Sequence, residues 1–171
     1  MNVVHIVQDN FLEAEQFKII HDLLMGPALP WFNHAGVEPG SGHQAIHADG
    51  YFIHTIFLNE PKRSRGPYSQ FYKMFEPLLQ KLNVDVLIRI RANNYPRTEK
   101  RVQHMFHVDY PWPHKTVIFG INTNNGFTIL EKNKKIESKA NRMLFLDGTT
   151  EHCSTTCTDV SNRINVIINY V

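Results

Sequence analysis

The chain contains 171 residues, of which 42% are hydrophobic and 20% are charged, and its formal net charge is +2. This composition suits one folded domain over residues 1–171 and excludes a disordered chain or a coiled coil. The net charge is too small to indicate a nucleic-acid or acidic-membrane partner. No apolar run approaches the roughly 18 residues of a membrane span, and the first residues lack the pattern of a signal peptide. We therefore expect a cytoplasmic protein that does not contact a membrane.

The cysteine and histidine counts direct the search for a site. The two cysteines, Cys153 and Cys157, exclude a disulfide framework and favour a reducing compartment. Their position beside His152 suggests zinc, but a structural zinc site needs four ligands and the chain has no second pair. We expect two inert thiols. Ten histidines is a high count, and histidine is the commonest metal ligand.

The first half of the chain is predicted to be partly helical. A short strand is predicted over 3–7, followed by a helix that Asn10 caps, with Glu13 at the third helical position. A second helix is predicted over 69–82 from its apolar spacing. Between the helices, 51–58 is an aromatic strand candidate.

After residue 83 the pattern changes to that of strands. Residues 84–91 alternate between two faces with a period of two. Two helices followed by many short strands predict an α+β protein with a sandwich or barrel. We divide it into a helical support region, 1–83, and a catalytic β-core, 84–171. Further strands are predicted at 105–109, 116–122, 127–130, 135–137, 142–146, 151–154 and 164–170.

A candidate metal site lies within this β-rich half. His107 and Asp109 are two residues apart in a predicted strand, so their side chains share one face. His152 follows 45 residues later on another predicted strand. Two imidazoles and one carboxylate form the facial triad of non-haem Fe(II) oxygenases, which leaves further coordination positions open.

A second His-x-Asp pair, His47 and Asp49, serves as an internal comparison. The next histidine, His54, follows after only five residues, which leaves no room for intervening strands. The pair also precedes the β-rich half. We therefore interpret it as a decoy.

Arg163 follows His152 by 11 residues and begins the last predicted strand. Residues 159–162 are typical of a turn, and a hairpin there would place Arg163 beside the strand of His152. A fixed guanidinium can bind a carboxylate through two parallel hydrogen bonds. The pattern predicts a metal at one end of a barrel and a carboxylate clamp further inside.

These residues resemble the 2-oxoglutarate/Fe(II)-dependent dioxygenases with a double-stranded β-helix (jelly-roll) core, in particular the small prolyl-4-hydroxylase-like branch. The N-terminal helices fit that branch, and residues 29–32, Leu-Pro-Trp-Phe, look similar to small phage-encoded members. The resemblance covers roughly residues 84–171. Its motifs are Phe106–Asp109, Thr116–Asn122, Gly126–Thr128, Asn141–Gly148, His152 and Arg163.

The resemblance implies a role for each matching residue. His107, Asp109 and His152 would bind Fe(II), and Arg163 would pair with the far carboxylate of 2-oxoglutarate. The cosubstrate pocket would also contain Tyr95, Thr116 and Asn165. The implied reaction consumes O2 and 2-oxoglutarate, releases succinate and CO2, and hydroxylates a C–H bond, with ascorbate as a candidate reductant.

Three departures from the family pattern qualify this resemblance. Phe127 replaces the second of two glycines, and Gly120 aligns with a tyrosine that often helps to hold the far carboxylate. Asn169 stands where the alkylation-repair branch has a second arginine, which argues against nucleic-acid dealkylation. Asp109 fills the position that halogenases leave as Ala or Gly, which favours hydroxylation.

Several alternatives stay open at this point. Arg89 and Arg91 share the polar face of a strand, and we expect that face to be solvated; if it points inward, they contact substrate or cosubstrate. The substrate is a peptide, a protein or a small molecule that enters over residues 97–104 and 110–114. A non-catalytic or cupin-like jelly-roll that binds a metal or ligand is the rival function. The remaining histidines, which we expect in solvated or loop positions, are His34, His43, His104 and His114.

Overall fold

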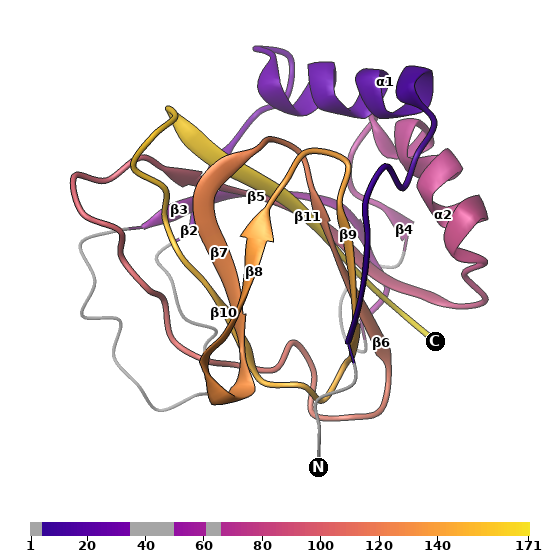
Figure 1. The fold of residues 1–171 in the computed structure, drawn as a ribbon. Helices are drawn as coiled ribbons and strands as arrows, with labels where there is room; N and C mark the ends of the chain where they lie inside the picture. Colours follow the sequence, from indigo (N-terminus) through magenta and orange to yellow (C-terminus); the bar gives the residue numbers. More distant parts are fainter. Residues whose placement is uncertain (1–4, 35–49, 61–65) are drawn as a thin grey trace.

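The computed structural model describes residues 5–34, 50–60 and 66–171. Within these ranges two β-sheets face each other, and the helices pack beside the larger sheet (Figure 1). The elements are β1 (His5–Gln8), α1 (Ala14–Met25), β2 (Phe32–His34), β3 (Tyr51–Leu58), β4 (Gly66–Pro67), η1 (Tyr72–Phe75), α2 (Glu76–Leu82), β5 (Leu87–Pro96), β6 (Lys115–Gly120), β7 (Asn124–Leu130), η2 (Glu131–Asn133), β8 (Lys134–Ser138), β9 (Met143–Asp147), β10 (His152–Ser154) and β11 (Asn162–Tyr170).

The strand order defines the architecture. The larger sheet has the order β1-β9-β6-β11-β5-β3-β2, with β4 also paired to β3, and the smaller sheet has the order β10-β7-β8. All of these pairs are antiparallel. After β6 the chain crosses between the two facing sheets several times: β7 and β8 lie in the smaller sheet, β9 in the larger, β10 in the smaller and β11 in the larger. This is the double-stranded β-helix, or jelly-roll, arrangement. The predicted α+β fold with this core is confirmed.

The central strands β5 and β11 are buried on both faces, and the two faces differ in chemistry. One face carries Ile90, Ala92, Val166 and Ile168, which pack into the main core against the helices. The opposite face points toward the smaller sheet, and its side chains on β5 and β11 are largely polar. The register pairs Arg163 with Tyr95, Asn165 with Asn93, and Asn169 with Arg89. The interior of the barrel is therefore polar along these two strands.

The start of α1 differs from the predicted capped helix. Asn10 has a φ of 51°, in the left-handed region, and the helix begins only at Ala14. Asn141 fixes this segment, because its Nδ2 donates to the carbonyl of Leu12 and its Oδ1 accepts from the Leu12 amide. Tertiary hydrogen bonds thus displace the helix start from the sequence signal.

The second predicted helix is divided in two. Residues 72–75 form the 3-10 helix η1, and α2 covers only Glu76–Leu82. Pro77 lies in the first turn of α2, where its missing amide hydrogen breaks no helical hydrogen bond. Asn83 ends α2 in the left-handed conformation.

The first 83 residues do more than supply supporting helices. β1 pairs with β9 at one edge of the larger sheet, and β3 pairs with β5 near the other edge. Strands 51–58 and 5–8 therefore belong to the sheet that forms the barrel wall. Among the described residues, no helix has the length and apolar character needed to cross a bilayer.

The carboxylate of Asp9 anchors the N-terminal segment to the turn between β8 and β9. Its Oδ1 accepts from Arg142 Nε at 2.6 Å, and its Oδ2 accepts from Lys139 Nζ at 2.8 Å. Hydrogen bonds from Arg142 and Lys139 hold the pKa of Asp9 well below its usual value. The folded protein therefore favours the ionised carboxylate more than the unfolded chain does.

We predict that Asp9→Asn lowers the free energy of unfolding by about 1 kcal/mol at pH 7, because this ion pair is partly exposed and screened. The folded pKa is depressed, so the contribution is present above the unfolded pKa and is lost as the pH falls. Urea unfolding should show that the difference in the free energy of unfolding between wild type and variant becomes smaller below about pH 4. An equal gap at pH 7 and pH 3 would contradict this assignment.

Candidate metal centre

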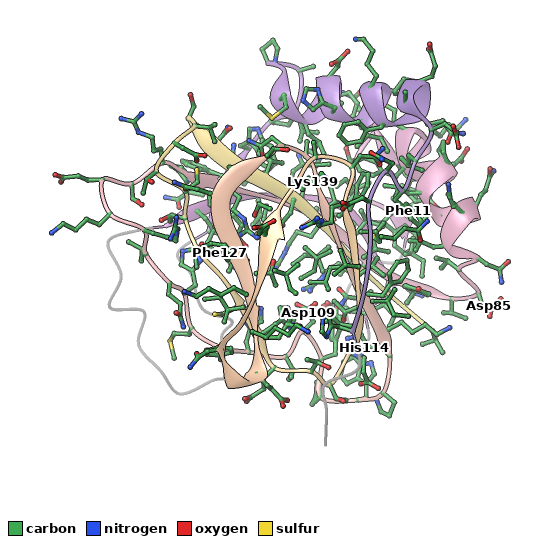
Figure 2. All side chains as sticks on the ribbon, viewed as in Figure 1. Phe11, Asp85, Asp109, His114, Phe127 and Lys139 are labelled. Carbon is green, nitrogen blue, oxygen red and sulfur yellow. The ribbon has the colours of Figure 1, made fainter. Side chains whose placement is uncertain are left out.

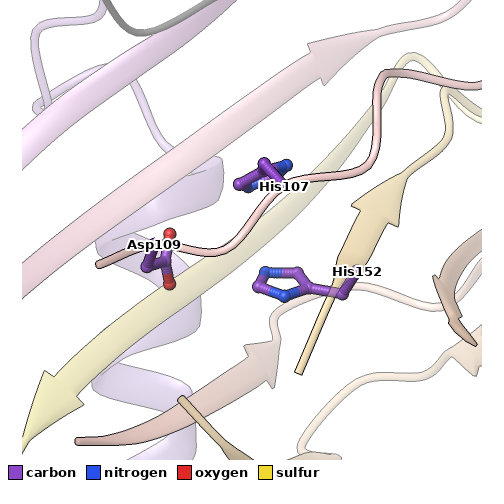
Figure 3. A group of neighbouring side chains, drawn as sticks. All are labelled: His107, Asp109 and His152. Carbon is purple, nitrogen blue, oxygen red and sulfur yellow. The ribbon is translucent and has the colours of Figure 1, made fainter. Parts of the chain in front are cut away.

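His107, Asp109 and His152 converge in the structure (Figure 3). One ligand atom from each side chain lies within 4.8 Å of the other two. The backbones of His107 and His152 exchange two hydrogen bonds of 3.0 Å, which form an isolated bridge. The regular strand predicted around residues 105–109 is wrong, because only this bridge and one at Gln103 tie the segment to residues 152–155. The single bridge is enough to set the imidazoles side by side.

Hydrogen bonds to backbone carbonyls fix the orientation of both imidazoles. His152 Nδ1 lies 3.0 Å from the carbonyl oxygen of Thr150, and His107 Nδ1 lies 3.2 Å from that of Met105. A carbonyl oxygen only accepts, so each Nδ1 carries a hydrogen, and in the neutral form of such an imidazole the lone pair is on Nε2. His152 Nε2 is buried without a hydrogen-bond partner. A metal ion would satisfy this atom, as is usual for histidines whose other nitrogen is fixed in this way.

Asp109 is held from two sides. Its side chain is only 2% exposed. Arg89 NH2 donates to Oδ1 at 2.7 Å, and Asn169 Nδ2 donates to Oδ2 at 2.8 Å. Burial raises the pKa of Asp109, but the charge of Arg89, the nearby His152 and the hydrogen bond from Asn169 outweigh it, so the pKa lies well below its usual value. The carboxylate is therefore ionised and oriented.

The electrostatics of the two imidazoles also suit metal binding. Burial, and then the neighbouring His152, lower the pKa of His107 below its usual value. A neutral imidazole is the form that ligates a metal. Two neutral nitrogens and one carboxylate oxygen fit Fe(II), and they leave coordination positions for other molecules. Within the described ranges, no other group of three such side chains comes together.

Of the second His-x-Asp motif and the histidine that follows it, the structure describes only His54. His54 is buried, and its two ring nitrogens lie 2.7 Å from the carbonyl oxygen of Pro30 and 2.8 Å from Ser69 Oγ. These contacts identify His54 as a structural histidine. His47 and Asp49 lie outside the described residues.

Arg163 is buried in the barrel and joins the two sheets. Nε donates to Ser138 Oγ at 2.6 Å, NH2 donates to Thr128 Oγ1 at 3.0 Å, and NH1 donates to the carbonyl of Thr155 at 3.2 Å. The guanidinium also lies 5.4 Å from the ring centre of Tyr95. Burial lowers the pKa of Arg163, and in the described part of the chain no carboxylate forms an ion pair with it. Two of its five N–H groups have no hydrogen bond to a protein acceptor here, so an anion could bind there.

The route that brings Arg163 into the barrel is not the predicted hairpin. β11 pairs with β5 and β6 in the larger sheet, whereas β10 pairs with β7 in the smaller one. The connection between β10 and β11 therefore crosses from one sheet to the other, and the prediction of adjacent strands is wrong. The arginine side chain, rather than the backbone, makes contact with Thr155 just after β10.

Gly126 makes room for this arginine. A Cβ atom at Gly126 would lie 2.6 Å from Arg163 Cδ, closer than real contacts allow. The next residue, Phe127, takes the place where the family often has a second glycine. Its ring is partly exposed, and two cations lie near the ring centre, Arg101 at 4.8 Å and Lys135 at 5.6 Å. The close approach of Arg163 therefore requires a glycine at position 126 but not at position 127.

The other predicted pocket residues face the same interior. Tyr95 lies against Arg163, and Asn165 Oδ1 accepts from Asn93 Nδ2 at 3.2 Å. Asn165 Nδ2 and Asn93 Oδ1 are buried without hydrogen-bond partners. Thr116 lies at the metal end, where its hydroxyl accepts from Asn169 Nδ2 at 3.0 Å. Along β11, Asn165 lies between the Arg163 end and the Asn169 end.

The burial of some polar residues at this site differs from the favoured expectation. Arg89 and Arg91 are only 5% and 7% exposed, so the expectation of a solvated face is wrong. His114 lies in a loop before β6, as expected, but it is buried, with Nδ1 2.7 Å from the carbonyl oxygen of Trp112 and Nε2 3.1 Å from Thr116 Oγ1. One feature of the sequence indicated that Arg89 and Arg91 are buried. The last strand, β11, has a polar face, and its neighbour β5 needs a polar face to match it.

The remaining histidines are half-buried rather than solvated where they can be described. His104 stacks on Tyr95 with ring centres 5.1 Å apart, and His34 meets Tyr51 edge-on at 5.1 Å. His43 lies outside the described residues. Cys153 and Cys157 are buried free thiols, as expected, and burial raises the pKa of Cys153 to about 11.

Comparison with solved structures identifies the fold. The chain is similar to a 2OG-Fe(II) oxygenase family oxidoreductase from Burkholderia pseudomallei, with a TM-score of 0.70 and 12% identity over 97% of this chain and 84% of that one. A Trichoplax adhaerens prolyl hydroxylase, solved with a hypoxia inducible factor peptide, gives a TM-score of 0.67 and 12% identity over 97% and 83%. A Pseudomonas putida prolyl-4-hydroxylase gives 0.56 and 10% over 99% and 93%.

These comparisons define the class of fold, and the resemblance read from the sequence agrees with them. The chain has the fold of the 2-oxoglutarate/Fe(II) oxygenases, a class that includes prolyl hydroxylases. No protein family profile and no curated protein sequence matches the chain. At 10–12% identity the likeness concerns the fold, so function has to be argued from the site.

We predict that the purified protein binds one Co(II) ion and that His152→Ala abolishes binding at concentrations that saturate the wild type. His152 Nε2 is buried and has no hydrogen-bond partner, so it is available to a metal ion. Isothermal titration calorimetry measures this directly. His21→Ala, which removes an exposed histidine from α1, is the matched control and should bind as the wild type does. Equal binding by the His152 variant would rule out this centre.

Proposed function

We propose that this chain is a 2-oxoglutarate- and Fe(II)-dependent dioxygenase that hydroxylates a C–H bond and releases succinate and CO2. The observation that carries the proposal is the pairing of two incomplete groups in one barrel. His152 Nε2 is buried without a partner within reach of two further ligands. Arg163 is a buried cation held only by neutral oxygens. A metal ion would complete the first group, and an anion would complete the second.

The residues at the two ends of the barrel have different proposed roles, metal binding at one end and carboxylate binding at the other. His107, Asp109 and His152 would hold Fe(II), which supplies the redox and dioxygen chemistry that side chains lack. Arg163 would bind the far carboxylate of 2-oxoglutarate through its remaining N–H groups. Tyr95 packs on that guanidinium and limits its movement. Asn165 and Asn93 offer an unpartnered donor and acceptor between the two ends.

The substrate class follows from how the site opens. Of the three ligands, His107 is the exposed one, whereas His152 is buried. Partly exposed apolar side chains adjoin it in sequence, namely Met105, Phe106 and Trp112. We propose that a peptide, protein or small molecule approaches from this side, over residues 97–104 and 110–114. The prolyl hydroxylases among the solved relatives favour a prolyl or other peptidyl target.

The proposal also covers the kind of substrate that is excluded, the location of the protein and the reductant. Asn169 is engaged with Asp109, where the alkylation-repair branch has an arginine, which argues against a nucleic-acid substrate. Two buried free thiols agree with a cytoplasmic location, in the host cytoplasm if the protein is phage-encoded. Ascorbate is proposed as a reductant that keeps the metal in its ferrous form.

We predict that the protein releases succinate from 2-oxoglutarate only with Fe(II) and O2, and that a peptide library containing proline increases the rate. Asp109→Ala should abolish release, because the metal loses its one anionic ligand. Mass spectrometry should find a mass increase of one oxygen atom in the accepted peptide. Retained turnover in Asp109→Ala would refute the proposed role of this centre.

A second prediction separates this function from a cupin-like metal enzyme or a non-catalytic binding module. Arg163→Met should raise the KM for 2-oxoglutarate about 100-fold, because a buried charged contact is lost. Gly126→Ala should raise it roughly tenfold by displacing Arg163 and weakening one hydrogen bond to a charged group. Co(II) affinity should stay unchanged in both variants. A cupin-like enzyme would be insensitive to either change.

A further inference from the structure

A buried hydrogen-bond network surrounds the metal-facing carboxylate. Arg89, from β5, donates from NH2 to Asp109 Oδ1 at 2.7 Å and from Nε to Asn169 Oδ1 at 3.0 Å. Asn169, from β11, donates to Asp109 Oδ2 at 2.8 Å. The Arg89 guanidinium thus binds one carboxylate oxygen of Asp109 directly. It also binds the Asn169 amide, which donates to the other carboxylate oxygen of Asp109.

Arg89 sets the orientation of the Asn169 amide. Asn169 Oδ1 accepts from the guanidinium, so its Nδ2 faces Asp109 and Thr116 and donates to both. His114 Nδ1 faces the carbonyl oxygen of Trp112 and donates to it. Its Nε2 lies 3.1 Å from the Thr116 hydroxyl. Turning the Asn169 amide around would break all three of its hydrogen bonds, so the network holds this amide in one orientation.

Packing restricts the movement of Arg89 further. The ring of Tyr110 lies 5.0 Å from its guanidinium carbon, and the Tyr110 hydroxyl donates to Glu60 at 2.5 Å. The Arg89 side chain is 6% exposed and that of Asp109 is 2% exposed. Two charged groups this deeply buried are held tightly only when their geometry is good and their other polar atoms are bonded. Both conditions are met here.

We propose that Arg89 is a positioning residue that, together with Asn169, orients the Asp109 carboxylate for the metal ion. Arg89 compensates the charge of Asp109 before the metal arrives and holds the carboxylate in the direction of the imidazoles. Outer partners of metal ligands typically change metal affinity by 10–100-fold when they are removed. This inference rests on the metal centre of the proposed function.

The test measures Mn(II) affinity by the loss of the free-ion EPR signal, at fixed pH and without 2-oxoglutarate. Arg89→Met and Asn169→Leu should each weaken Mn(II) binding about 10–100-fold. Arg89→Lys should give an intermediate affinity, because an ammonium keeps the charge but cannot bond Asp109 and Asn169 in one plane. The expected order is wild type, then Arg89→Lys, then Arg89→Met.

Arg142→Met is the matched control. It removes another arginine that bonds a carboxylate, Asp9, at the β8–β9 turn rather than at the metal site. We expect it to lower thermal stability while leaving Mn(II) affinity unchanged. If Arg89→Met does not fold, the Arg89→Lys and Asn169→Leu variants still decide the matter.

The outcomes separate the two claims. Unchanged Mn(II) affinity in the Arg89 and Asn169 variants, with normal binding by the wild type, overturns the positioning role but leaves the metal centre standing. A wild-type protein that binds no Mn(II) overturns the metal centre and this inference with it. Equal weakening in Arg142→Met would show a general effect of stability and would overturn the specific role of Arg89.

Discussion

The polar stripe that runs between the sheets along β5 and β11 is the constraint on which the rest of the structure depends. Burying polar and charged groups is costly unless they are hydrogen-bonded, so the barrel has to supply partners for them. Asp109 finds its partners in Arg89 and Asn169, and Arg163 finds neutral ones in Ser138, Thr128 and Thr155. The atoms left over, on His152, Asn165 and Asn93, face the same interior. The stripe therefore stays incomplete without a ligand.

The two ends of the stripe have different chemistry, and this difference supports a two-part site. Asp109 and His114 lie toward the end of the barrel away from α1 (Figure 2). There an ionised carboxylate and two imidazoles are arranged for a cation. At the Arg163 end of the β5–β11 pairing, a buried guanidinium is arranged for an anion. A dicarboxylate cosubstrate could fit both ends, because one of its ends would chelate the metal ion and its other carboxylate would meet the guanidinium. The solved relatives share the fold, while the argument for activity comes from these side chains.

The sequence was sufficient for the class of fold and for the residues that converge. The period-two alternation of β5 and β11 and the spacing of His107, Asp109, His152 and Arg163 reflect local geometry, which a sequence records directly. What it could not show is which way a strand face points. The same alternation fits a solvated face or a barrel interior, so Arg89 was assigned to solvent although it is 5% exposed. The crossing from the smaller to the larger sheet before Arg163 could not be predicted, because turn residues do not specify which strand the next strand pairs with. The helix start at Ala14 depends on Asn141, 127 residues away in the chain.

The most direct test of the account is an anaerobic titration of the metal-free protein with Fe(II), with and without 2-oxoglutarate, followed by visible absorbance. The account predicts a weak charge-transfer band that needs both additions, because the metal ligands and the anion site act on one bound molecule. Metal binding without such a band would contradict it. The barrel would then hold a metal ion for another purpose, and the assignment of 2-oxoglutarate to Arg163 would be wrong.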